Sequence, residues 1–290
     1  AYPFYYAAIE VEAWGSETIF SADGPPLCGA PVIRRPEEID QISAPEIGAS
    51  PMLQRVLHTI AGLKLRLADQ VPIIGVAISP FSLPVMQMGF DRYIELMYEQ
   101  PERFLKLMQA NEEFTVAWAN AQLAAGATAI CYFDPVSSTT NITRELYLRT
   151  GQQVTKRTLA RIKGATATHL ASGRGLPIIG DIADTGTAMV GISVLEDLAR
   201  LKAAAGGRIS LLGNLNGIEM RRWTPQQTEL AVKRAIAQAG PGGGFILADN
   251  HGEIPFQVPD ETLLAIRDAV DRWGRYPLEW IKDWDDPGPD

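Results

Sequence analysis

Cysteine is scarce in this chain of 290 residues, which holds only Cys28 and Cys131. Two thiols are too few for a disulfide scaffold, and they are typical of reduced residues in a cytoplasmic protein. Long apolar runs are also missing, because none approaches the roughly 18 residues of a membrane span. No cationic segment followed by an apolar one opens the chain, as it would in a secretory leader. We therefore expect a cytoplasmic protein without a membrane segment.

An excess of positive charge is missing as well. The chain has 26 Lys and Arg against 34 Asp and Glu, a formal net charge of −8. The pairs Arg34-Arg35 and Arg221-Arg222 are isolated, so they predict solvated surface rather than a basic patch. Nucleic acid and anionic membranes are therefore excluded as expected partners. With 46 % hydrophobic and 21 % charged residues, the composition is that of an ordinary soluble globular protein.

Short apolar runs separated by helix-like sequence dominate the rest of the chain. Such runs are typical of a parallel sheet that is buried on both faces. About 250 residues of this alternation commonly form one (β/α)8 barrel. We predict an α/β chain with one barrel at residues 1–280 and a loose acidic tail at residues 281–290. The runs lie at residues 75–81, 129–135, 166–172, 189–193, 209–216 and 245–251, with a weaker one at 17–23.

Helices are predicted between these runs. Residues 91–123 fit one or two long helices, with Pro101 placed to start the second. Thr224 with Pro225 opens another helix by capping. Residues 177–186 fit either a short strand or a short helix, and the alternation favours the helix. The other predicted helices lie at residues 51–70, 143–163 and 194–205, with the last one starting at Pro259.

Several strand ends carry residues that can do chemistry. In a barrel the carboxyl ends of the strands line one mouth, so Asp134, His169, Asn214, Asp249 and His251 are expected to share it. His169 and His251 are candidate ligands of a divalent metal, with zinc the first candidate. The alternative is a pair of histidines that hydrogen-bond to neighbours without metal. Asp134 equally fits a capping role in the turn before Pro135.

The sequence resembles the uroporphyrinogen decarboxylase superfamily, which consists of (β/α)8 barrels. The resemblance covers residues 10–278, and it implies a shortened amino-terminal segment relative to the family. Four segments carry it: VAISPFSL at 76–83, GATAICYFDP at 126–135, LGNLN at 212–216 and NHGEIP at 250–255.

The decarboxylase branch of this superfamily has an arginine-bearing amino-terminal segment and an aspartate in an Ile-Phe-Ser-Asp stretch. This chain reads Ile19-Phe-Ser-Ala-Asp23, so the acid is displaced by one residue, and its start has no comparable arginine segment. For porphyrinogen decarboxylation, the resemblance implies that Asp23 stabilises the protonated pyrrole ring. No metal is required in that reaction.

The methyltransferase branch resembles this chain more closely, in Asp23-Gly-Pro-Pro, Gly191-Ile-Ser193 and Gly213-Asn214. Its members hold zinc with a His-x-Cys pair and a later Cys, and they activate a thiol. Here His169 matches the histidine, Ala171 replaces the first cysteine, and His251 replaces the second. A shell without thiolates suits an oxygen or nitrogen substrate better than a soft sulfur.

The resemblance implies a corrinoid-dependent methyltransferase, in which the corrinoid is supplied by a partner protein. His169 and His251 would bind the metal, with Asp134 or Glu253 completing the shell, while Asn214 acts on the substrate. Phe81, Tyr132 and Ser193 are the expected substrate contacts. The alternatives are a uroporphyrinogen decarboxylase and a barrel without catalytic activity inside a corrinoid enzyme complex. The methyl donor or acceptor and the oligomeric state stay open.

Overall fold

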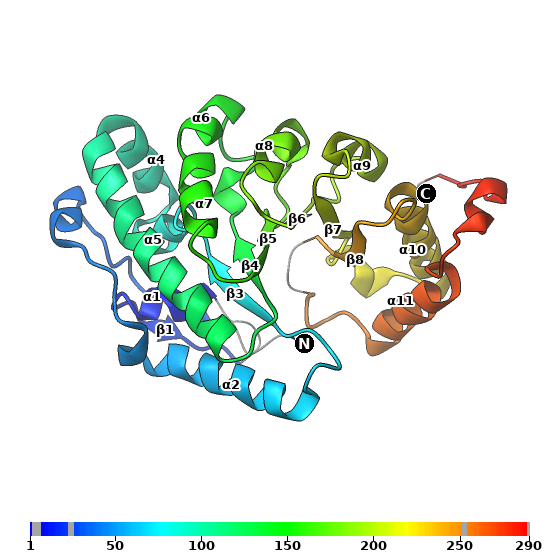
Figure 1. Cartoon of the computed structure of the whole chain (residues 1–290), viewed down its shortest axis with the longest axis horizontal. Coiled ribbons are helices and arrows are strands. Elements are labelled where there is room, and N and C mark those ends of the chain that lie inside the picture. The colour runs from blue at the N-terminus through cyan, green and yellow to red at the C-terminus, as the bar shows by residue number, and fades with distance from the viewer. Residues whose placement is uncertain (2–6, 23–25, 251–253, 289–290) are drawn as a thin grey trace.

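A six-stranded parallel sheet forms the centre of the computed structural model, which describes residues 1, 7–22, 26–250 and 254–288. Its strands follow one another across the sheet in chain order (Figure 1). In the described part of the chain, no ladder of hydrogen bonds joins the first of these strands to the last. The strands are β3 (Ile74–Ile78), β4 (Ala129–Phe133), β5 (Ala165–His169), β6 (Met189–Gly191), β7 (Ser210–Leu215) and β8 (Phe245–Asp249).

Helices connect each of these strands to the next, which confirms the predicted α/β class. The connecting helices are α3 (Leu83–Met88), α4 (Phe90–Glu99), α5 (Pro101–Ala124), α6 (Arg144–Arg149), α7 (Gly151–Leu159), α8 (Ile179–Ala183), α9 (Leu198–Ala205) and α10 (Pro225–Ala239). A further helix, α2 (Pro51–Leu67), precedes β3, and α11 (Asp260–Trp273) follows β8. The short helix predicted within residues 177–186 is present as α8, and Thr224 caps α10 as predicted. In the described residues, no helix combines the length and the apolar character that a membrane span requires.

Three predictions about elements were wrong. The run at residues 17–23 does not join the parallel sheet: β1 (Thr18–Ile19) pairs antiparallel with β2 (Leu27–Cys28). The single helix predicted at 143–163 is broken at Thr150, whose backbone leaves the helical region with φ −124° and ψ −84°. The helix predicted at 194–205 begins only at Leu198, where the Asp197 side chain accepts a bond from Arg200 N.

Side chains of the strands alternate between the surrounding helices and the interior of the sheet's curve. On β4, Ile130 and Tyr132 belong to a buried cluster shared with α2 and α5. Cys131 and Phe133 therefore face the opposite side. On β7 and β8 the same rule puts Leu211 and Leu247 against the helices, and Asn214 toward the interior.

The outer edge of β3 is hydrogen-bonded by groups that do not belong to a parallel strand. Ile74 N donates to the carbonyl of Ala1. The amide of Gln122 on α5 accepts from Val76 N at 3.0 Å and donates to Val76 O at 2.7 Å. The carboxylate of Glu10, on α1 (Ala7–Glu12), accepts from Ile78 N at 2.9 Å. These side chains complete the backbone bonds of an edge that would otherwise be unsatisfied.

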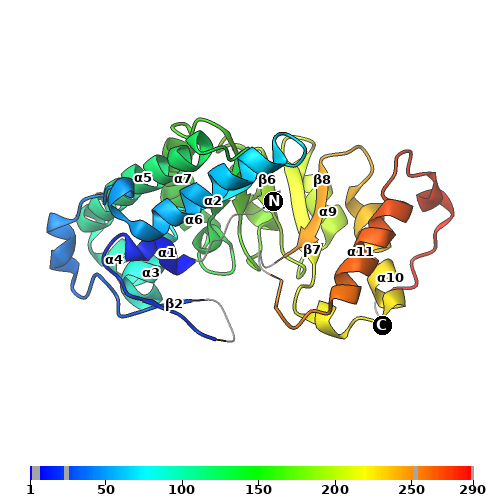
Figure 2. The same cartoon turned by 90° about the horizontal axis from the view of Figure 1, so that it is seen from below.

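The carboxyl-terminal segment packs against α10 and α11, at the end of the molecule opposite α4 and α5 (Figure 2). Lys233 Nζ lies 4.1 Å from the ring centre of Trp273, and it also faces the rings of Trp280 and Trp284. Arg234 pairs with Asp286 at 2.7 Å. Two residues of the predicted tail at 281–290, Trp284 and Asp286, thus contact Lys233 and Arg234 of α10.

Replacing Gln122 with leucine tests the contribution of the β3 edge. The Gln122→Leu variant leaves Val76 N and Val76 O without partners, so its free energy of unfolding should fall by about 2 kcal/mol. Urea denaturation followed by circular dichroism measures the change. Gln153→Leu is the control, because the amide of Gln153 is exposed and donates only to nearby groups, Leu148 O and the side chain of Gln152. Equal stabilities of the two variants would contradict this account of the edge.

Candidate functional site

The interior face at the carboxyl ends of β5 to β8 brings together an imidazole, an amide and a glycine. The register aligns Phe133, His169 and Gly191 across β4, β5 and β6. The imidazole of His169 stacks on the Phe133 ring, with 5.8 Å between ring centres. It also covers Gly191, since a Cβ built there would lie 2.5 Å from His169 Cδ2. The glycine thus creates the space that the imidazole occupies.

His169 itself is 4 % exposed, and its Nδ1 accepts a hydrogen bond from Ala171 N at 3.0 Å. The backbone N–H can only donate, so Nδ1 holds the lone pair and the neutral ring carries its proton on Nε2. In a metal-binding histidine, one ring nitrogen binds the ion through its lone pair, and the N–H of the other nitrogen donates to a neighbour. In His169 the nitrogen that contacts its neighbour accepts a hydrogen bond instead. The observed contact therefore does not fit His169 as a metal ligand.

The other residues of the expected metal site give no support for metal binding in the described part of the chain. His251 and Glu253 lie outside the described residues, as does the expected catalytic Asp23. Within the described part, no three His, Cys, Asp or Glu side chains lie close enough to hold a metal ion. Burial also raises the pKa of the Cys131 thiol to about 12, so Cys131 is not a thiolate at neutral pH.

Asn214 and Ser193 lie together at the ends of β7 and β6, as the sequence predicts. Asn214 Nδ2 donates to Ser193 O at 3.1 Å. The hydroxyl of Ser193 donates to Ser172 O at 2.9 Å and accepts from Leu195 N at 3.1 Å. The Ser193 hydroxyl is fully buried and holds loops together. Asn214 is the member of this pair that lines the interior, because strand alternation directs it to the face opposite that of Leu211, which packs against the helices.

Asp134 is placed differently from His169, although both end neighbouring strands. Its side chain is 1 % exposed, and Oδ1 accepts hydroxyl bonds from Ser79 at 2.5 Å and Ser82 at 2.7 Å. Ser137 donates to Oδ2 at 2.6 Å. Burial raises the pKa of Asp134, and these donated bonds oppose the rise. The cluster ties the loops after β3 and β4 together, which is the bonding of a structural carboxylate.

Phe81 and Tyr132, the expected substrate contacts, belong to the core instead. Both are fully buried: the Phe81 ring packs on Tyr93 and Phe104, and the Tyr132 hydroxyl lies 3.4 Å from that of Thr155 on α7. The prediction overlooked strand alternation, which directs Tyr132 to the helices. The same alternation would have identified Phe133, which is in register with His169.

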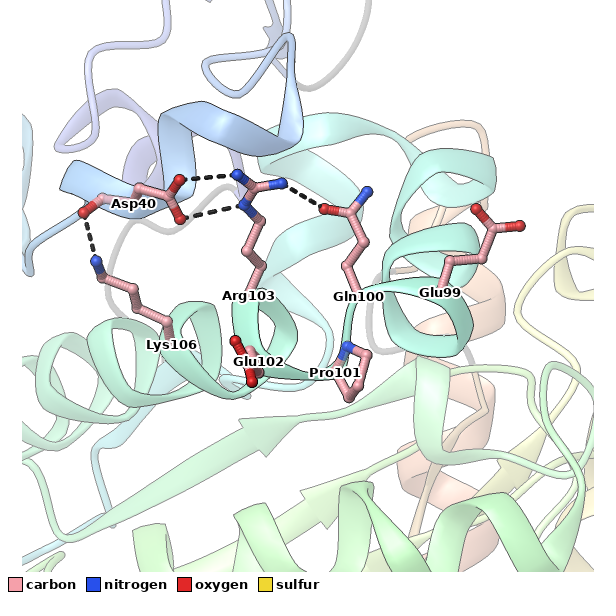
Figure 3. Close-up of a pocket in the computed structure, with 7 residues that line it drawn as sticks. All are labelled: Asp40, Glu99, Gln100, Pro101, Glu102, Arg103 and Lys106. Carbon is pink, nitrogen blue, oxygen red and sulfur yellow. Dashed lines mark hydrogen bonds and ion pairs between the residues drawn. The ribbon is translucent and has the colours of Figure 1, made fainter.

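A cavity of about 630 Å³ lies away from the strand ends, beside the start of α5 (Figure 3). Its two cations are already engaged. Arg103 binds both carboxylate oxygens of Asp40 and the Gln100 side chain, while Lys106 donates to Asp40 O. These bonds fasten the 3₁₀ helix at Pro36–Gln41 to α5. The cavity is lined by Asp40, Glu99, Gln100, Pro101, Glu102, Arg103 and Lys106.

Comparison with known proteins gives one family match. The family model described as "Uroporphyrinogen decarboxylase (URO-D)" matches residues 1–273. A uroporphyrinogen decarboxylase of Actinobacillus pleuropneumoniae is 26 % identical over 274 residues, which cover 91 % of this chain and 76 % of that protein. A uroporphyrinogen decarboxylase of Cellvibrio japonicus is 28 % identical over 243 residues, which cover 77 % of this chain and 65 % of that protein.

Among solved structures, a methyltransferase from Methanosarcina mazei superposes with a TM-score of 0.84 at 20 % sequence identity. The match covers 95 % of this chain and 80 % of that one. A B12-independent methionine synthase from Shewanella matches more weakly, with a TM-score of 0.52 over 74 % of this chain and 66 % of the other, at 14 % identity. At these identities the two structural matches establish the fold alone.

Asp134→Asn tests the structural role of the buried carboxylate. The raised pKa means that the folded protein holds this proton more tightly than the unfolded chain. Wild-type stability should therefore fall relative to the variant as pH rises above about 3.9, the ordinary aspartate value, through the raised pKa. The carboxamide of this variant keeps an acceptor for Ser79 and Ser82, whereas Asp134→Ala should lose about 2–4 kcal/mol.

Urea denaturation of the three proteins at several pH values measures these differences. A wild type that gains stability over the Asp134→Asn variant as pH rises would contradict the raised pKa.

Proposed function

Because the chain belongs to the uroporphyrinogen decarboxylase family, we propose that it transfers a methyl group between a small substrate and a corrinoid carried by a partner protein. The observation that carries the proposal is the chemistry of the strand ends. His169 and Asn214 line the interior, and no Lys or Arg occupies the last two positions of β3 to β8 or the first described position after each. The likeness to the Methanosarcina methyltransferase supports the same function.

The lack of cations at these described positions weighs against a polyanionic substrate. A porphyrinogen presents many carboxylates, and burying them requires basic partners. Asn214 and the imidazole of His169 suit a small substrate of low charge. The corrinoid is proposed to arrive on its own protein, so no residue of this chain is assigned to hold it.

His169 acts through the proton on Nε2 in this proposal. When a methyl group leaves a heteroatom, negative charge develops on that atom, and a preorganised donor lowers the barrier. The contact from Ala171 N fixes the ring in the tautomer that carries the proton on Nε2. Asn214 orients the substrate beside it. The geometry of His169 does not fit a metal ligand, so no step of this reaction is assigned to a metal.

Decarboxylation of uroporphyrinogen is the second candidate, because the family model and the sequence relatives carry that name. Parallel assays separate the two candidates. We expect the purified protein to change the absorbance of methylcobalamin when thiols, amines or phenols are offered as acceptors. We expect no turnover of uroporphyrinogen under conditions in which the Actinobacillus decarboxylase turns it over. The opposite pair of results would establish the decarboxylase, and inactivity in both assays would favour a non-catalytic partner.

Gly191→Ala tests the position of the imidazole. The added methyl group would collide with His169, and displacing a reacting group by about 1 Å costs up to roughly a hundredfold in rate. We expect methyl transfer to slow by about tenfold to a hundredfold, with the circular dichroism spectrum unchanged. Gly62→Ala on α2 is the matched control, because its added carbon meets no atom within 4 Å beyond its chain neighbours and the backbone of its own helix. An unchanged rate in the Gly191 variant would remove His169 from the reaction.

A further inference from the structure

Asn250 directly follows β8, and its side chain is a buried amide that the described residues leave unbonded. Its exposed fraction is 1 %, and neither Nδ2 nor Oδ1 has a hydrogen-bond partner in the described part of the chain. Buried amides in folded proteins are nearly always bonded, because an unsatisfied donor or acceptor lowers stability. The backbone position is well fixed, since Asn250 N donates to Leu215 O. The side-chain amide of Asn250 can therefore form hydrogen bonds with a ligand, because no described residue occupies its donor or its acceptor.

The alternation along β8 places this amide on the interior side. Leu247 packs among the residues that contact the helices, so Ile246 and Ala248 face the other way. The bond from Asn250 N to Leu215 O continues the strand pairing one residue past Asp249, which directs Asn250 to the same side as Ala248. Ala248 is the strand partner of Asn214. Asn250 therefore lies two residues after the strand partner of Asn214, on the same face of the sheet as the imidazole of His169.

We propose that Asn250 binds a neutral substrate group with an adjacent hydrogen-bond donor and acceptor, such as a carboxamide or the equivalent edge of a nitrogen heterocycle. Nδ2 requires an acceptor and Oδ1 requires a donor, and a carboxamide supplies both in one plane. A carboxylate supplies acceptors only and leaves Oδ1 unsatisfied. This inference rests on the proposed function for placing the substrate at these strand ends, and it adds the chemical class.

The stability of the ligand-free protein tests whether the amide is truly unsatisfied. Asn250→Leu removes both polar atoms at similar volume, and it should raise the melting temperature by about 2–4 °C. Asn111→Leu is the matched control, because Asn111 is equally buried and exchanges two 3.0 Å bonds with Gln87. That variant should melt lower than the wild type. A lower melting temperature for Asn250→Leu would overturn the inference.

Binding of two small probes tests the substrate class without any turnover. Benzamide and benzoate have the same shape, and NMR titration should show that the wild type binds benzamide at least about tenfold more tightly, the discrimination expected of one polar contact. Asn250→Leu should lose this preference, whereas Asn111→Leu should keep it. Equal affinity for the probes, no binding of benzamide, or an unchanged preference in Asn250→Leu would overturn the inference. Binding as expected without any methyl transfer would leave the inference standing and reject the proposed reaction alone.

Discussion

The hydrogen bonding of the outer edge of β3 is the constraint on which the rest of the structure depends. Val76 and Ile78 direct backbone groups away from β4, and these groups meet Gln122 from α5 and Glu10 from α1. Side chains of two helices thus form the hydrogen bonds that a neighbouring strand would otherwise form. Because β3 sets the register of β4, and each strand sets that of the next, the position of His169 on β5 follows from this edge.

The strand ends separate two kinds of polar chemistry by the face on which each residue lies. Toward the helices, Asp134 is enclosed by serine hydroxyls and stabilises the connection between two loops. Toward the interior, His169 and Asn214 present groups that suit a small molecule. Phe133 and Asp134 are adjacent in the chain, and strand alternation directs the first to the interior and the second to the helices.

The sequence alone predicts the fold better than it predicts the site. Apolar runs locate β3 to β8, and Pro101 and Thr224 locate helix starts, because these signals are local. The break at Thr150 was missed, since neither Thr150 nor Gly151 is by itself a signal strong enough to end a helix. His169 and Asn214 were placed correctly at strand ends. The bonding state of the Asn250 amide depends on its neighbours in space, so no spacing in the sequence could reveal it.

The tryptophans around Lys233 make the docking of the carboxyl-terminal segment detectable by fluorescence. Trp273, Trp280 and Trp284 gather there, and Trp223 packs against the same apolar cluster, whereas Trp14 and Trp118 lie with the buried side chains near α1 and α5. Emission from the first group depends on that segment staying docked, and emission from the second depends on the opposite end of the molecule. The protein therefore carries two native optical probes, one at each end of its long axis, with the parallel sheet between them.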